Sequence, residues 1–427
     1  MTEKFDPTNV DPALWRGLTQ RRFSRRDLLR YSGMGAGALG LGAFLAACGT
    51  SGSTGSGGGG GGSKLPNAGM GTTSWWDKQT LHKQLEFANW PYYIDVSHGK
   101  HPSLDKFTSA TGIKVDYQEV IQDNNEFFAK IRPLLQAGQP TGYDLMVMTS
   151  NSPVLAALFD SGWVIPIDHR KMTNFNKYAS DLAKSPAWDP GNKYSMAWQS
   201  GYTALAYNTD MIKEDITSVQ SLFDSKYKGK VGMFTDPQEL GSLGLLAVGV
   251  DPVKSTPADW QKAADKLSQQ KSDGIVRQYY DQSYIHALNN GDTWISEAWS
   301  GDIFIANQNG HTNLKLVIPE EGAMFWTDNM LIPINAKNPL DAMTYMDFVY
   351  DPTIQAMIEG YDAYVCPVPA AQAIMAASSD SYTQAAAKSP TVFPSAEIAA
   401  LSRAYYNYKN DQELQQWNSI FQPIIQS

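Results

Sequence analysis

Short apolar or alternating runs, each followed by an amphipathic helical run, repeat along the chain from about Lys83. In one helical run, Asp259–Gln269, the side chains of Trp260, Ala263 and Leu267 fall on one face. Strands that alternate with helices favour mostly parallel sheets covered by helices on both faces, so the predicted fold class is α/β. The predicted strands are Leu85–Trp90, Lys114–Val120, Asp144–Met148, Lys230–Phe234, Thr293–Trp299 and Lys315–Ile318.

A second helix is predicted from the residues at its ends. Asp351 has the chemistry of an N-cap, Pro352 suits the first turn, and Gly360 is a typical terminal residue. These signals predict a helix that begins after Asp351 and ends at Gly360.

The size and charge of the chain limit its organisation and its partners. A chain of 427 residues is too long for one ordinary hydrophobic core, which predicts two lobes. Its net charge of -9 argues against nucleic acid, because phosphate binding needs a basic face.

The N-terminus has the layout of an export signal. Paired arginines in Ser24–Arg30 precede an uncharged run, Tyr31–Ala47, which ends in small residues before Cys48. This resembles a twin-arginine signal joined to a lipoprotein box, so residues 1–47 are predicted to be the signal and Cys48 the lipidated residue, on the outer face of the cell membrane. The run is glycine-rich and shorter than the ~20 residues of a membrane-spanning helix. Cys366 would then be the remaining thiol, and no internal disulfide could form.

A flexible tether is predicted to follow the signal. Residues 48–70 are rich in glycine and serine, and after Cys48 they contain no apolar side chain before Leu65. Such a sequence cannot pack into a core and is typical of a linker. We therefore expect the folded body to be held near a membrane surface.

Aromatic and acidic residues recur just after the predicted strands. Ligands of parallel α/β sheets gather past the carboxyl ends of strands. Indole and phenol faces attract an ammonium group by ~0.5–2 kcal/mol per contact, and a carboxylate accepts a charge-assisted hydrogen bond from it. The pattern therefore predicts a site for a small cationic amine, and its residues are Trp90, Tyr93, Asp236, Glu239, Trp299, Trp326 and Asp328.

Simpler interpretations exist for each residue, and catalytic signals are few. A tryptophan can be plain core, and Asp236 can be a helix cap.

Catalytic motifs are missing from the sequence: the chain has no GxSxG, HExxH or CxxC motif. His98 and His101 have the spacing of a metal pair but no nearby further ligand, so no metal and no cofactor is expected. A secreted enzyme and a pure interaction protein are the alternative classes.

Several stretches between Leu85 and Ala371 resemble the substrate-binding lipoproteins of ABC importers, specifically the spermidine/putrescine-binding proteins. The most specific stretch is FWTD, Phe325–Asp328, with the following IPINAKN. The matching stretches are Leu85–Ile94, Phe107–Tyr117, Tyr143–Val147, Ile165–Lys177, Tyr227–Asp236, Glu297–Gln308, Ile318–Asn338 and Glu359–Ala370.

The resemblance implies a two-lobed periplasmic-binding-protein clamp of type II, each lobe a mostly parallel sheet covered by helices. Lobe 1 would comprise residues 83–202 and 327–371, and lobe 2 residues 203–326 and 372–427. The chain would cross between lobes near Gly201, near Trp326 and again around Ala371. It also implies a monomeric, non-enzymatic receptor whose partners are an amine ligand and an ABC permease.

The resemblance further implies roles for individual residues. Trp326 would stack on the alkyl-ammonium chain, and Asp328 would receive an amino group. Two choices stay open, Asp236 or Glu239 and Tyr361 or Tyr364. Thr149–Ser152 lacks an aromatic that the family usually carries, so a quaternary amine, an amino-sugar conjugate or a sugar is an alternative solute. The implied ligand-binding residues are Trp90, Tyr93, Ser150, Asp236, Glu239, Trp299, Trp326, Asp328, Tyr361 and Tyr364.

Overall fold

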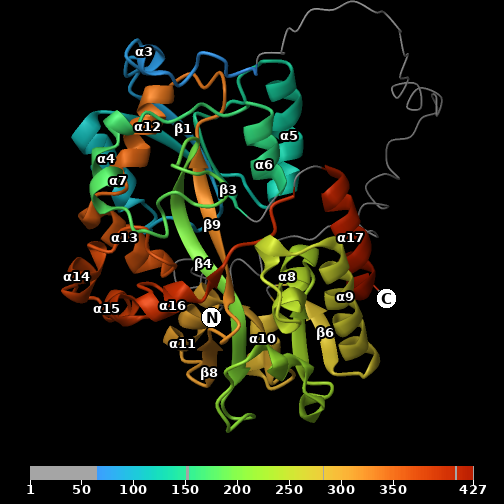
Figure 1. The fold of residues 1–427 in the computed structure, drawn as a ribbon. Coiled ribbons are helices and arrows are strands. Elements are labelled where there is room, and N and C mark those ends of the chain that lie inside the picture. The colour runs from blue at the N-terminus through green and yellow to red at the C-terminus, as the bar shows by residue number, and fades with distance from the viewer. Residues whose placement is uncertain (1–64, 151–152, 282, 409–410, 427) are drawn as a thin grey trace, which may run out of the picture.

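The structure is a computed structural model that describes residues 65–150, 153–281, 283–408 and 411–426 (Figure 1). The predicted signal, the predicted lipidation at Cys48 and most of the predicted tether lie outside these residues.

One sheet runs through the described part of the molecule. Its strands follow the order β2-β1-β3-β9-β4-β7-β5-β6, with β10 beside β9 and β8 beside β4. The pairs within each end of the sheet are parallel, whereas β4 and β9 are antiparallel to each other and to β3, β7 and β8. The strands are β1 (Gln84–Asn89), β2 (Lys114–Glu119), β3 (Leu145–Thr149), β4 (Ser195–Asn208), β5 (Val231–Phe234), β6 (Val276–Tyr280), β7 (Ile295–Trp299), β8 (Leu314–Val317), β9 (Ala323–Leu331) and β10 (Ser402–Arg403).

Helices cover both ends of this sheet (Figure 1). Among the described helices, none combines the length and the apolar character needed to cross a membrane. The α-helices are α3 (Thr73–Trp76), α4 (Pro102–Thr111), α5 (Asn124–Gln136), α6 (Pro153–Asp160), α7 (Thr173–Tyr178), α8 (Pro237–Ala247), α9 (Pro257–Ser272), α10 (Tyr284–Asn289), α11 (Ser300–Gln308), α12 (Pro339–Phe348), α13 (Pro352–Asp362), α14 (Ala371–Ala376), α15 (Ser381–Lys388), α16 (Ala396–Ala400) and α17 (Asp411–Gln426), and the 3-10 helices are η3 (His169–Lys171), η4 (Val219–Phe223), η5 (Ser225–Tyr227) and η6 (Pro252–Lys254).

The long strands β4 and β9 pass through both halves of the molecule (Figure 1). The first half contains β1 to β3 with α4 to α7, α12 and α13, and the second contains β5 to β8 with α8 to α11 and α17. Each half has its own core: Phe87 and Met330 belong to one cluster, and Trp260 and Trp417 to another. Helices α14 and α15 pack on α13 in the first half, whereas the sequence placed all of residues 372–427 in lobe 2.

The six predicted strands correspond to β1, β2, β3, β5, β7 and β8, and helix α9 is confirmed. For α13 the start is confirmed, because Asp351 accepts bonds from the N–H groups of Thr353 and Ile354. The predicted end at Gly360 is wrong. The helix continues to Asp362, and Ala363, with φ 52°, takes the left-handed position that follows it. Gly360 instead allows close packing, since a Cβ there would lie 3.1 Å from the Oγ1 of Thr383.

The N-terminal segment joins the body earlier than the sequence predicts. Asn67 is buried, and its Nδ2 donates to the carbonyl of Val164 over 2.9 Å. The indole of Trp76 is fully buried, and its Nε1 donates to the carbonyl of Pro166. The prediction that the tether extends to residue 70 is therefore wrong, because its last residues are packed against the body.

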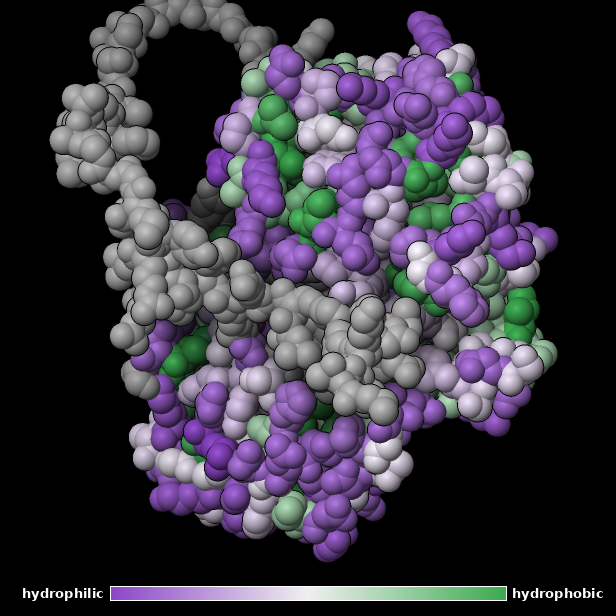
Figure 2. Space-filling model, turned by 180° about the vertical axis from the view of Figure 1, so that it is seen from behind, coloured by the Kyte–Doolittle hydropathy of each residue, from purple (hydrophilic) through white to green (hydrophobic). Residues whose placement is uncertain are grey.

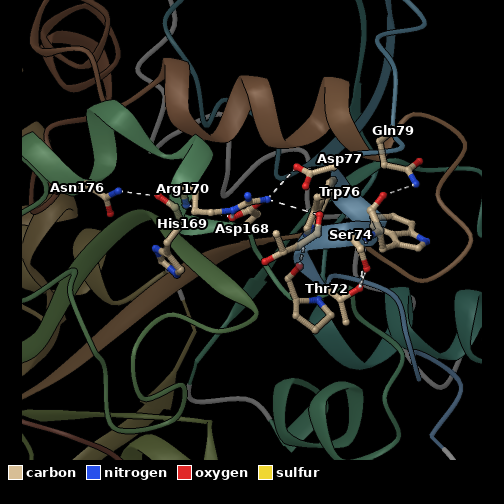
Figure 3. A network of polar contacts seen from close by, with 12 residues as sticks. Thr72, Ser74, Trp76, Asp77, Gln79, Asp168, His169, Arg170 and Asn176 are labelled. Atoms are coloured by element: carbon tan, nitrogen blue, oxygen red, sulfur yellow. Dashed lines mark hydrogen bonds and ion pairs between the residues drawn. The ribbon is translucent and has the colours of Figure 1, made fainter.

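A charged cluster fixes the same segment from outside (Figure 3). The guanidinium of Arg170 contacts Asp77 over 2.9 Å and Asp168 over 2.6 Å. Arg170 and Asp77 are half exposed, so the ion pair between them contributes modestly to stability beside the buried indole, whereas Asp168 is buried.

Hydrophobic residues on the described part of the face seen from behind form small separate patches among hydrophilic ones (Figure 2). Large exposed apolar side chains, such as Leu81, Leu134 and Ile374, lie on different segments of the chain. This dispersed pattern is ordinary for a protein surface.

Candidate functional site

The strand register places several predicted residues on one face of the sheet. Trp326 of β9 lies opposite Gly201 of β4, and Trp299 at the end of β7 lies opposite Thr203. Residues that are directly opposite in neighbouring strands share a face, as do residues two apart in one strand. Asp328 therefore lies on the same face as both tryptophans.

The carboxylate of Asp328 is held by two hydroxyl groups. Tyr93 and Thr149 donate to its two oxygens, each over 2.6 Å. The Asp328 residue is 7% exposed. Burial, followed by the charge of Asp328, raises the pKa of Tyr93 well above its usual range, so the phenol keeps its proton and remains a donor. These bonds fix the orientation of the acid.

Three aromatic rings form a continuous group next to this acid. The ring of Tyr364 lies edge-on to Trp326 and to Tyr93, with 5.5 Å between centroids in both cases. Two glycines make room for the rings. A Cβ on Gly201 would lie 2.3 Å from the Trp326 indole, and one on Gly301 would lie 2.7 Å from the Tyr364 ring. Larger residues at either position would displace the aromatic group.

Trp299 belongs to a second aromatic group that adjoins the first. Its ring packs at a tilt of 31° against Phe234, 4.5 Å between centroids, and it is half-buried between the cores of the two halves. The hydroxyl of Tyr284 accepts a hydrogen bond from the backbone N–H of Trp299 and donates one to Asp302, each over 3.1 Å. Asp302 is buried and follows Trp299 by three residues. The sequence prediction missed Asp302 and Tyr284, although both the motif WSGD and the start of α11 carry a signal for an acid at this place.

The two candidate acids of α8 have different surroundings. Glu239 is buried, and both of its oxygens accept from the hydroxyl of Tyr405, over 2.9 and 2.7 Å. Burial, with the charge of Asp236, raises the pKa of Glu239 well above its usual range. Asp236 is exposed, and it caps α8 by accepting from the N–H groups of Gln238 and Glu239. Although the side chain is exposed, the surrounding protein removes part of its hydration, and this raises the pKa of Asp236. The charge of Asp123 raises that pKa further.

Glu297 is a further acid that the sequence did not single out as a site residue. It is completely buried on β7, where one oxygen accepts from the N–H of Phe234 over 2.6 Å. Burial raises the pKa of Glu297 to about 8. At neutral pH this side chain therefore carries its proton most of the time.

The remaining predicted residues, Trp90, Ser150 and Tyr361, have contacts outside the aromatic group. Trp90 follows β1, and its indole N–H donates to the carbonyl of Val147 over 3.2 Å. Ser150 holds the crossing strand, since its hydroxyl accepts from the N–H of Thr327 over 3.0 Å. Tyr361 lines a separate cavity of about 420 Å³ beside α13 and α14. Of the two alternative tyrosines, the structure thus brings Tyr364 to Trp326 and places Tyr361 elsewhere.

Within residues 65–426, as far as they are described, no three metal-binding side chains lie close enough to hold an ion. His98 is exposed, and its ring contacts the neighbouring Ser97. The side chains gathered around Asp328 and Glu239 are carboxylates, phenols and indoles, and groups of these kinds suit the recognition of a cation.

Comparison with known proteins identifies the family. Residues 103–390 match the family described as bacterial extracellular solute-binding protein. The spermidine/putrescine-binding periplasmic protein of Escherichia coli (strain K12) is 28% identical over 322 residues, 75% of this chain and 85% of that protein. The putrescine-binding periplasmic protein SpuD of Pseudomonas aeruginosa (strain UCBPP-PA14) is 30% identical over 335 residues, 74% of this chain and 85% of that protein.

A solved structure agrees with these relatives. A putative spermidine/putrescine ABC transporter from Listeria monocytogenes has a TM-score of 0.64 and 25% identity, and the match covers 80% of this chain and 98% of that one. The type II periplasmic-binding-protein fold and the resemblance predicted from the sequence are confirmed. The chain belongs to the bacterial extracellular solute-binding proteins.

Proposed function

We propose that this chain is a receptor that captures a cationic amine of the polyamine class and delivers it to an ABC permease without chemical turnover. The contacts that run from Asp328 through Tyr93 and Tyr364 to Trp326 carry this proposal. The acid would accept a charge-assisted hydrogen bond from an ammonium group, and the rings would contact the adjacent methylenes. Relatives named as binding spermidine or putrescine support this ligand class.

Ligand binding would be coupled to the arrangement of the two halves. Asp328 and Tyr93 lie with the first half, whereas Trp299 and Asp236 lie at the ends of strands in the second. An amine that contacts both sets stabilises the closed arrangement, because only that arrangement completes its contacts. We propose the predicted crossings near Gly201 and Trp326 as the hinge.

The proposed location is the outer face of the cell membrane. Relatives are named as periplasmic proteins, which supports export of this chain. The signal in residues 1–47 and the lipid anchor at Cys48 remain part of the proposal, as does a monomeric state. They agree with the sequence pattern described above.

A melting and calorimetry screen of the full chain tests the ligand class. We expect putrescine and spermidine to raise the melting midpoint, because a ligand of the native state stabilises it by about 2.7 kcal/mol at 100 times its Kd. Choline and maltose serve as the competing solutes. A shift with choline or maltose and none with either polyamine would reject the proposal, and turnover of a bound amine would favour an enzyme.

A further inference from the structure

A cavity of about 620 Å³ lies beside the candidate site, between the two halves. From the first half, Pro153, Ala156, Ala157 and Asp160 line it, and their spacing of three and four residues shows that one face of α6 forms the wall. From the second half, the segment 404–408 and parts of η6 and α17 close it. Small-molecule sites in proteins have volumes of this order, about 300–1,000 Å³.

Two residues connect this cavity to the candidate site. Ser150 lines the cavity, and its neighbour Thr149 donates to Asp328. Tyr405 also lines the cavity, and its hydroxyl donates to Glu239. The cavity thus borders the acidic end of the site on both halves, and at Ser150 the border is formed by a small side chain.

The walls of the cavity are already held in place. Asp189 is buried and accepts from the N–H groups of residues 193–195 and from the Ser195 hydroxyl, which fixes the loop on one side. On the other side, Tyr406 donates to Glu413 and Tyr408 donates to Gln238. Because these polar groups are engaged within the protein, the phenol rings offer mainly their apolar faces.

Two of the three charged side chains in the lining are already engaged within the protein. The charged residues in the lining are Asp160, Asp189 and Lys193. Asp189 is turned toward its own loop, and Asp160 is exposed to solvent. The ammonium of Lys193 lies 4.7 Å from the centroid of the Tyr194 ring, so this aromatic face already has a cation. Tyr194 stacks on Phe159, 5.1 Å between centroids with an interplanar angle of 27°. A flat uncharged group beside Phe159, which also lines the cavity, would extend this stack without repulsion.

We propose that this cavity receives an uncharged, flat substituent of the amine, such as an aryl or acyl group. The ligand class of this chain would then be N-substituted polyamines, with the ammonium at Asp328 and the substituent in the cavity beside Phe159, the ring on which Tyr194 is stacked. This inference rests on the proposed function, since it extends the same site.

Calorimetry of the full chain with putrescine and with N-benzylputrescine tests this inference. Both compounds carry two positive charges, so they differ in the benzyl group alone. We expect N-benzylputrescine to bind roughly ten-fold or more tightly than putrescine, the gain typical of one buried ring. Ala157→Phe should fill the cavity and bring this ratio close to one, with putrescine binding unchanged. Ala373→Phe, at an exposed position of α14, is the matched control and should keep the ratio.

Each outcome separates the two proposals. If putrescine binds but the benzyl group gives no gain, or if Ala157→Phe leaves the gain intact, the cavity inference is wrong while the proposed function stands. If neither amine binds, the proposed function itself fails. Should Ala157→Phe not fold, Tyr194→Leu removes the stacking ring and must lower the ratio by several-fold for the inference to hold.

Discussion

Trp326 and Asp328 reach the same side of the sheet because they are two residues apart in β9. An unpaired buried acid beside an indole would be costly, and here two hydroxyl donors orient the carboxylate. The pair is therefore positioned before any ligand arrives. Such preorganisation lowers the entropic cost of binding.

Gly201 tests whether the position of Trp326 matters for binding. Gly201→Ala should destabilise the protein by about 1–3 kcal/mol and weaken putrescine binding, because the new Cβ would lie 2.3 Å from the indole. Urea unfolding and calorimetry measure the two effects. Gly241→Ala is the matched control, since its Cβ would lie equally close to Trp417 in the core of the second half. We expect the control to lose stability and to keep its affinity; equal affinities in all three proteins would contradict the role of Trp326.

Glu297 should make stability depend on pH. Its folded-state pKa is raised from the ordinary 4.5 to about 8. Between these values the folded state holds a proton that the unfolded state releases, so the group stabilises the fold below pH 4.5 and this contribution is lost as pH rises toward 8. The slope from this group is at most about 1.4 kcal/mol per pH unit.

Urea unfolding at pH 5, 6, 7 and 8 checks this expectation. Glu297→Gln should flatten the fall of unfolding free energy relative to the unaltered protein. Glu397→Gln, at an exposed position of α16, should leave the slope unchanged. Parallel pH profiles for Glu297→Gln and the unaltered protein would show that Glu297 is not protonated in the fold.

The sequence predicted site residues that lie within the matched stretches, and it missed those that reach the site from other elements. Tyr93 follows β1 as predicted, whereas Trp326 and Asp328, expected after a strand, lie inside β9. The sequence does not predict Tyr405, because this residue comes after the matched stretches and meets Glu239 only through the path of the chain after β10. A contact between residues so far apart leaves no local pattern.

At the element scale, helix α8 presents the clearest separation of structural and binding roles. Asp236 both caps this helix and lies exposed at its start. Asn caps helices about as well as Asp. Asp236→Asn should therefore keep the unfolding free energy within about 0.5 kcal/mol, while putrescine affinity falls roughly ten-fold if the acid receives the second ammonium.

Calorimetry and urea unfolding of the same samples measure both quantities. Asp380→Asn is the matched control, because Asp380 is an exposed cap of α15 on the first half. An unchanged affinity in Asp236→Asn would assign this acid to capping alone.

The strands that cross the molecule were the main omission at this scale. β4 and β9 are buried along their whole length, so they show neither the alternation of a half-exposed strand nor clear turn residues at their midpoints.

The predicted end of α13 was wrong for another reason. In sequence Gly360 has the character of a stop signal, but in the fold it serves helix packing against Thr383.

At the scale of the whole molecule, residues 65–79 attach the start of the described chain firmly to the first half through Asn67, Trp76 and Arg170. The proposed lipid anchor would therefore connect to a fixed point on the body. Cys48→Ala should move the protein from the membrane fraction to the soluble fraction in the producing cells. Cys366→Ala alters a buried thiol of the body and should leave the protein with the membrane. Retention of Cys48→Ala on the membrane would contradict the anchor.

The central claim is that one amine binds between the halves with its ammonium on Asp328. Calorimetry of spermidine and putrescine with Asp328→Asn tests it most directly. Asp144→Asn is the control, because Asp144 is a buried acid of the first half that lies away from the site and accepts hydrogen bonds from backbone N–H groups. We expect Asp328→Asn to weaken binding ten-fold or more, the scale of a lost charge-assisted hydrogen bond, and Asp144→Asn to leave affinity unchanged. Equal affinity in Asp328→Asn and the unaltered protein would contradict the claim.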